Sequence, residues 1–104
     1  MSEVIAILFF ALALYLVVIG VTVRNRARRA LFDLGVLILA ADQRLDQARD
    51  PQALKLLLER ADANLKRAQL YSAAGHPSMA LSLASATHYH LLVALEEQGF
   101  KVPF

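Results

Sequence analysis

The sequence predicts an all-α protein in which a single N-terminal transmembrane helix is followed by a small cytoplasmic bundle of about three helices. Three observations lead to this prediction: an uncharged apolar run near the N-terminus, apolar residues at helical spacing after it, and prolines that mark later helix starts. Hydrophobic residues make up 58% of the 104 residues. Soluble domains contain roughly 45–50%, so we expect some apolar surface to face lipid or protein.

The first predicted element is a membrane-spanning helix from Val4 to Val23. This run of 20 residues has no charge, and at 1.5 Å per residue a helix of this length extends about 30 Å, the hydrocarbon thickness of a bilayer. A cleaved signal peptide is the alternative. It is disfavoured because the chain starts Met-Ser-Glu rather than with basic residues, and because arginines follow where small residues would mark a cleavage site. The residues that represent the predicted span are Val4, Phe9, Phe10, Tyr15 and Val23.

A cluster of arginines directly follows the apolar run and predicts its orientation. No basic residue precedes the run, so the positive-inside rule places the N-terminus outside and the C-terminal domain in the cytoplasm. The same arginines are candidates for contact with anionic lipid headgroups. Nucleic acid is not an expected partner, because no aromatic residues interleave the cluster and residues 30–104 are close to neutral. The cluster consists of Arg24, Arg26, Arg28 and Arg29.

We divide the chain into a membrane anchor with its basic flank, residues 1–29, and a helical bundle, residues 30–104. No proline interrupts residues 4–49, so the anchor is expected to continue as a long helix into the bundle. Residues 34–41 are apolar on every side, which predicts that this stretch is covered from more than one direction. The apolar stripe of this helix consists of Leu31, Leu34, Ile38, Ala41, Leu45 and Ala48.

A second bundle helix is predicted to begin at Pro51. Asp50 is a favoured N-cap residue, and proline fits the first helical position because its missing N–H would be unpaired there. Asp62 and Lys66 have the spacing of an i,i+4 ion pair. Gly75 is expected to close this helix. Its predicted core stripe is Leu54, Leu58, Ala61, Leu65 and Ala68.

The last predicted helix runs from Pro77 to about Gln98, with Gly99 closing it. Residues 77–95 contain no Asp, Glu, Lys or Arg, so a second membrane span is an alternative. The serines, histidines and alanines of this stretch make insertion unfavourable compared with the first run, and a helix buried in the bundle is favoured. Its predicted stripe is Ala80, Ala84, Thr87, Leu91 and Ala94.

The stretch 61–95 resembles a helical hairpin of the tetratricopeptide class, and the resemblance is one of shape. It covers about a third of the chain, lacks the tryptophan and leucine-glycine signature, and does not recur at a period of 34 residues. The positions that carry it are Tyr71, Gly75, Ala80, Leu81 and Ala84.

No combination of residues predicts chemistry, so we expect neither an enzyme nor a cofactor, metal or small-molecule substrate. The chain has no cysteine, phosphate-binding glycine loop or HExxH motif. The histidines are His76, His88 and His90, and the last two point about 200° apart on a helix, so they cannot share a metal. We expect structural roles for all three, with capping sufficient to explain His76.

The predicted function is a non-catalytic, membrane-tethered protein-protein interaction module, an accessory or assembly subunit of a membrane complex. Its expected partners are membrane lipid and either other protein subunits or a second copy of the chain. The alternatives are a membrane-perturbing protein of the holin-like or toxin-like kind, and a sensor in which His88 titrates. The residues predicted to contact a protein partner are Leu34, Leu37, Ile38, Leu39, Phe100 and Phe104.

Overall fold

The computed structural model of the chain describes residues 2–102 and is helical throughout this range apart from short connections. It contains three α-helices, α1 (Ser2–Gln43), α2 (Pro51–Ala73) and α3 (Pro77–Glu97), and a short 3-10 helix, η1 (Leu45–Gln47). The described residues form no strand. The predicted all-α class, with a long apolar first helix and a helical hairpin after it, is confirmed.

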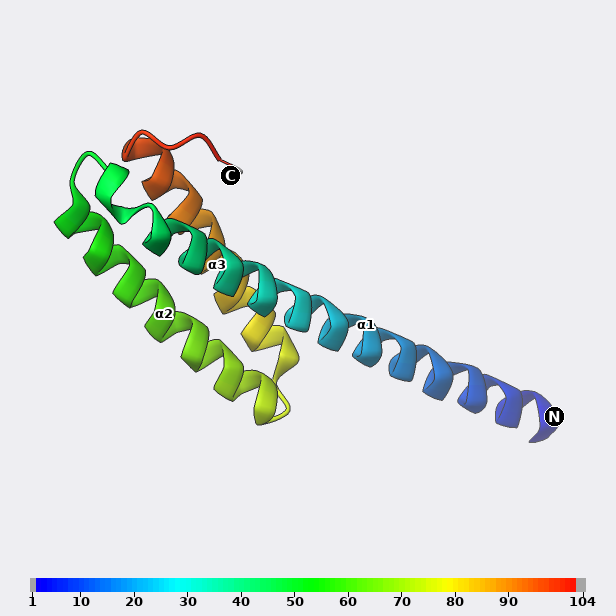
Figure 1. The fold of residues 1–104 in the computed structure, drawn as a ribbon. Coiled ribbons are helices and arrows are strands. Elements are labelled where there is room, and N and C mark those ends of the chain that lie inside the picture. Colours follow the sequence, from blue (N-terminus) through cyan, green and yellow to red (C-terminus); the bar gives the residue numbers. More distant parts are fainter. Residues whose placement is uncertain (1, 103–104) are drawn as a thin grey trace.

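Helix α1 is continuous over 42 residues and crosses the predicted boundary at residues 29–30 without a break. Its first half projects away from the rest of the chain, while its second half packs with α2 and α3 (Figure 1). The molecule is consequently 69 Å long but only 25 by 16 Å across. The bundle therefore has three helices because the second half of α1 supplies one of them.

The end of α1 differs from the prediction. The apolar stripe suggested a helix as far as Ala48, but α1 ends at Gln43 and the chain turns through η1. A residue that precedes a proline is disfavoured in helical conformation, which helps to break the chain before Pro51. The turn is attached to the end of α3, because the Asp50 N–H donates to Gln98 Oε1 at 2.7 Å. Leu45 and Ala48 still pack against the core.

The predicted helix boundaries around the two prolines are confirmed. Asp50 caps α2 by accepting a hydrogen bond from the Ala53 N–H at 3.2 Å, and Pro51 occupies the first turn. Gly75 has φ +84°, a conformation that glycine adopts without a steric penalty. With it the His76 N–H donates to the Tyr71 carbonyl at 2.8 Å, which completes a Schellman motif at the end of α2.

The core lies between the three helices and follows the predicted stripes in part. On α3 Leu95 is buried where the stripe had Ala94, and on α1 Leu37 is buried while Leu31 and Ile38 are half-buried. The largest fully buried side chains of the core are Leu34, Leu54 and Leu95, one from each helix. Burying one leucine contributes about 1.5–3 kcal/mol. The small core residues let the helix axes approach closely. The buried residues are Ala27, Leu34, Leu37 and Ala41 of α1, Leu54, Leu58, Ala61 and Ala68 of α2, and Ala80, Ala84, Thr87, Leu91 and Leu95 of α3.

Residues 34–41 pack against both α2 and α3, but one side of this stretch remains uncovered. Leu34, Leu37 and Ala41 are buried, but the side chains of Val36 and Leu39 are 50% and 58% exposed. Helices α2 and α3 therefore cover this stretch from two directions, as the sequence suggested, and leave the side with Val36 and Leu39 open.

Candidate functional site

The first half of α1 is an apolar helix that nothing in the described chain covers. Phe9, Phe10 and Tyr15 are 71%, 73% and 63% exposed, whereas Val23, at the end of the run, is half-buried. Among residues 2–102, α1 is the one helix that is long and apolar enough to cross a membrane, and none of its most apolar 18-residue window is buried. A core helix of a soluble protein can have the same composition, but it would be covered.

The backbone groups and the Thr22 hydroxyl of this segment find their hydrogen-bond partners within the helix. The Thr22 hydroxyl donates to the Val18 carbonyl at 2.8 Å. Backbone groups in hydrocarbon need partners inside the same segment, and a continuous helix supplies them. The segment therefore meets the hydrogen-bonding requirement of a membrane-spanning helix as well as the length requirement.

Arg24, Arg26, Arg28 and Arg29, hereafter the basic collar, follow the apolar segment, and all four are exposed. Successive residues of a helix differ by about 100° in direction, so these side chains spread over roughly 200° of the helix circumference rather than share one narrow face. Arg29 Nε lies 4.0 Å from Asp33 Oδ2, and both side chains are more than half exposed. Such an exposed pair is weak, so the collar keeps most of its positive charge available.

The residues predicted to contact a protein partner on α1 lie on two different sides of the helix. Leu34 and Leu37 are 0% and 8% exposed and belong to the chain's own core. Ile38 is half-buried and packs against that core. Leu39, at 58% exposed, is the member of this group that faces outward.

The predicted contacts in the C-terminal tail also differ from one another. Phe100 is half-buried and packs against the core. Its N–H donates to the Leu95 carbonyl at 3.0 Å, which closes α3 with the same Schellman motif that closes α2. Phe104 lies outside the described residues.

An exposed apolar stripe on α1 contains the predicted contact Leu39 together with Phe32 and Val36, which were not predicted as contacts. Phe32, Val36 and Leu39, hereafter the outer stripe, are 71%, 50% and 58% exposed. Their steps of four and three residues place them on one side of α1, opposite Leu34 and Leu37. This spacing is visible in the sequence, but it could not be separated from the core stripe because the whole stretch is apolar.

A groove of about 460 Å³ lies between α1 and α3 beside the outer stripe. Phe32 and Val36 line one wall, Leu92 and His88 of α3 line the other, and Val102 of the tail closes one end. Asp33 and Glu96 also line this groove. Phe32 and Val36 of the outer stripe thus belong to the groove, whereas Leu39 lines a separate hollow between α1 and α2.

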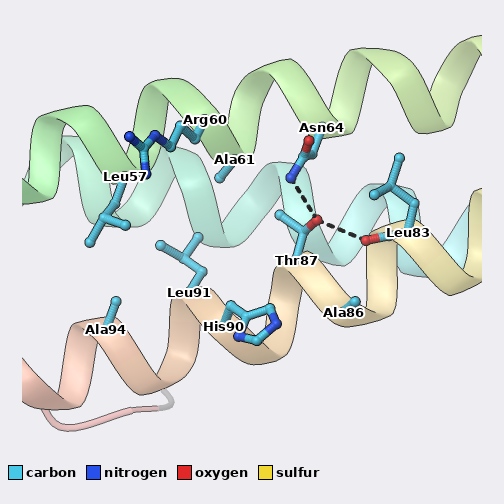
Figure 2. Close-up of a pocket in the computed structure, with 10 residues that line it drawn as sticks. All are labelled: Leu57, Arg60, Ala61, Asn64, Leu83, Ala86, Thr87, His90, Leu91 and Ala94. Carbon is cyan, nitrogen blue, oxygen red and sulfur yellow. Dashed lines mark hydrogen bonds between the residues drawn. The ribbon is translucent and has the colours of Figure 1, made fainter.

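A second groove, of about 270 Å³, lies between α2 and α3. At its end the Thr87 hydroxyl donates to the Leu83 carbonyl at 2.8 Å and accepts from Asn64 Nδ2 at 3.3 Å (Figure 2). Arg60 and His90 are the charged or titratable side chains at this groove. The groove holds neither a nucleophile beside a base nor a pair of carboxylates, so its geometry supports no particular reaction.

The three histidines lie in three different places. His88 lines the α1–α3 groove and His90 lines the α2–α3 groove, as their predicted divergence requires. His76 occupies the N-cap position of α3, but its side chain makes no capping hydrogen bond. The capping explanation for His76 is therefore wrong. Among residues 2–102 no three His, Cys, Asp or Glu side chains gather closely enough to hold a metal ion.

Comparison with known proteins yields no significant match to any family model, curated protein or solved structure. The function is therefore argued from the chain's own surfaces.

Proposed function

We propose that this protein is a non-catalytic, membrane-anchored interaction module, an accessory or assembly subunit of a membrane complex. The first half of α1 crosses the bilayer, and the bundle stands at the cytoplasmic surface. The observation that carries this proposal is the uncovered apolar half of α1, which continues without a break into a folded bundle.

The continuity of α1 supports a permanent anchor over a removable signal sequence. Ala27 is fully buried in the bundle core only four residues after Val23. Cleavage near the end of the apolar run would cut one continuous helix next to the residues that pack the bundle. Because α1 both spans the bilayer and supplies one of the three bundle helices, an uncleaved α1 fits the structure better than a removed signal sequence.

The basic collar supports the orientation with the bundle in the cytoplasm. Basic residues close to a span are retained on the cytoplasmic side, and the collar lies directly after the span, whereas no Lys or Arg precedes it. The exposed guanidinium groups also fit the anionic headgroups of that leaflet.

The outer stripe and the α1–α3 groove support a protein partner. Phe32, Val36 and Leu39 repeat at the spacing of a helix-packing seam. Because the stripe lies on the helix that forms the span, a partner helix packed against α1 in the bilayer would continue along it. The partner is thus a helical segment of another membrane subunit or of a second copy.

Two measurements test this function. Reporters fused to each end should place the C-terminus in the cytoplasm, and the protein should stay in the membrane pellet after alkaline extraction. A chain that is soluble without detergent would contradict the anchor.

The partner surface is tested by replacing Phe32 and Leu39 with glutamate. In mild detergent the wild type should co-purify with a partner protein or a second copy of the chain. The double glutamate variant should lose that partner but still insert into the membrane. Leu56→Glu is the matched control, because Leu56 is 59% exposed on α2, away from the outer stripe. If the wild type, the double glutamate variant and Leu56→Glu recovered the same amount of partner, the outer stripe would not be the contact surface.

A further inference from the structure

The turn between α2 and α3 lies at the level where the apolar half of α1 ends. Helix α3 runs parallel to α1: Ala30 lies beside Ala84, and Ala40 lies in the same groove as Glu96. Continuing this register toward the N-terminus brings Pro77 level with Val23. Figure 1 shows the turn at the end of the bundle from which the projecting half of α1 emerges. Val23 is half-buried while Val21 is exposed, so coverage of α1 begins at this level.

Residues 70–79, hereafter the tip, present apolar side chains to the outside. Leu70 in the last turn of α2 is 70% exposed, and Met79 in the first turn of α3 is 50% exposed. Ala73 and Ala74 between them are also exposed. The described chain therefore covers these side chains only in part.

The charge around the tip is positive. No acidic residue occurs between Asp62 and Glu96, whereas Lys66 and Arg67 are exposed near the end of α2. The opposite end of the bundle carries most of the acidic residues, which are Asp42, Asp46, Asp50, Glu96 and Glu97. Arg44, Arg49 and Lys101 offset part of that charge and leave the far end with five acidic and three basic residues. Near the tip Lys66 is paired with Asp62 at 3.1 Å, so Arg67 supplies the net positive charge on the side of the basic collar.

We propose that the tip is a second membrane contact, which rests on the anionic surface of the leaflet from which α1 emerges. Leu70 and Met79 enter the boundary between headgroups and acyl chains, and Arg67 joins the basic collar in facing lipid phosphates. This contact holds the bundle in one orientation relative to the bilayer and thereby fixes the direction in which the outer stripe faces around the axis of α1. The inference depends on the proposed anchoring of α1.

Lipid fits the tip better than a protein partner for two reasons. The tip is held by α1 at the depth of the headgroups, and apolar side chains beside basic ones match the chemistry of an anionic interface. Each basic residue near such a surface shifts the balance toward contact roughly fivefold.

The test uses single-cysteine variants of the full chain, which contains no cysteine of its own. A fluorophore is attached at Ala74→Cys in the tip, at Gln47→Cys at the far end of the bundle, or at Tyr15→Cys in the span. Each protein is reconstituted into vesicles of phosphatidylcholine and phosphatidylglycerol that carry a quencher at the headgroup or in mid-bilayer. The Ala74 label should be quenched several-fold more strongly by the headgroup quencher than the Gln47 label.

The charge requirement is tested in the same vesicles. Arg67→Gln should lower the equilibrium constant for contact between the tip and the membrane, measured by quenching of the Ala74 label, roughly fivefold. Vesicles of pure phosphatidylcholine should lower it further. Arg60→Gln is the matched control, since Arg60 is exposed on α2 about two turns farther from the tip and should leave quenching unchanged.

The outcomes separate this inference from the proposed function. A Tyr15 label that escapes the mid-bilayer quencher would overturn the anchor and the tip contact together. A quenched Tyr15 label with equal headgroup quenching at Ala74 and Gln47 would overturn the tip contact and leave the anchor intact. Quenching at Ala74 that is the same in neutral and anionic vesicles would overturn the role of charge.

Discussion

Two stretches of this chain are similar in length and equally free of Asp, Glu, Lys and Arg, yet they have opposite environments. Residues 4–23 of α1 are almost entirely exposed, whereas residues 77–95 of α3 supply five of the buried residues of the bundle. Lack of charge alone therefore does not decide whether a helix remains uncovered. What differs is the kind and arrangement of the uncharged side chains.

The apolar half of α1 is bulky on every side, and α3 is not. Phe, Leu, Ile and Val surround α1, so no face of it is suited to water. Helix α3 places Ser82, Ser85 and His90 outward and Ala80 and Ala84 inward. A one-sided pattern with small inward residues favours close packing between helices, and an all-round pattern favours lipid.

The largest expected effect comes from placing charge in the apolar half of α1. Leu12→Arg combined with Leu14→Arg should oppose membrane insertion by on the order of 5 kcal/mol, because each arginine near the centre of a span costs about 2.5–3.5 kcal/mol. The fraction of protein in the alkali-extracted membrane pellet measures this effect. Leu56→Arg on α2 adds charge to an exposed bundle position and should leave that fraction unchanged. If the double variant stayed fully in the membrane pellet, residues 4–23 would not be the segment that anchors the protein.

The same truncation made in the two stretches should have very different consequences for the bundle. Leu95 is fully buried and Leu16 is 59% exposed. Leu95→Ala should lower the free energy of unfolding of the bundle by about 2–5 kcal/mol because it leaves a cavity, whereas Leu16→Ala should leave it unchanged. Amide hydrogen exchange of α2 and α3 in detergent gives both values. Equal protection in the two variants would mean that Leu95 is not part of a packed core.

A smaller effect is expected at the start of α2. Asp50→Ala removes the acceptor of the Ala53 N–H and should destabilise the bundle by about 1 kcal/mol. Asp50→Ser should retain most of the stability, because a serine hydroxyl can accept the same hydrogen bond. Asp46→Ala in η1 removes an exposed carboxylate that caps no helix and serves as the control. Denaturant unfolding followed by circular dichroism compares the three variants, and an unstable serine variant would point to the charge instead of the cap.

An effect of similar size is expected from a comparison of two threonines with the same local hydrogen bond. Thr22 and Thr87 each donate to the carbonyl four residues earlier at 2.8 Å, but Thr87 also accepts from Asn64 of α2. Thr87→Val should lower bundle stability by roughly 0.5–1.5 kcal/mol, and Thr22→Val should not change it. Hydrogen exchange at the α2–α3 contact provides the measurement. Identical protection in both variants would show that the bond between Asn64 and Thr87 adds nothing.

Features that depend on neighbours along the chain were predictable. Pro51 and Pro77 begin helices and Gly75 and Gly99 close them, because backbone restrictions act within a few residues. The Asp62–Lys66 ion pair at 3.1 Å follows directly from its i,i+4 spacing. The length of the apolar run and the position of the basic collar are equally local, so the candidate span was found from the sequence.

Which apolar residues remain available to a partner was not predictable in the same way. Residues 34–41 are apolar all round, and only packing against α2 and α3 separates buried Leu34 and Leu37 from exposed Leu39. Phe32 was missed for the same reason. The hydrogen bonds between Asp50 and Gln98 and between Asn64 and Thr87 join residues far apart in the chain. No local sequence pattern predicts these two hydrogen bonds.

The amino-acid sequence by itself determined the helices, both ends of α2 and α3 and the segment suited to lipid, since these follow from backbone geometry and from side chains within a turn or two. The three-dimensional packing determined which side of α1 faces the core and brought the α2–α3 turn level with the end of the apolar segment. Those features depend on where distant helices meet, and the free energy of such contacts is set by shape and coverage rather than by composition.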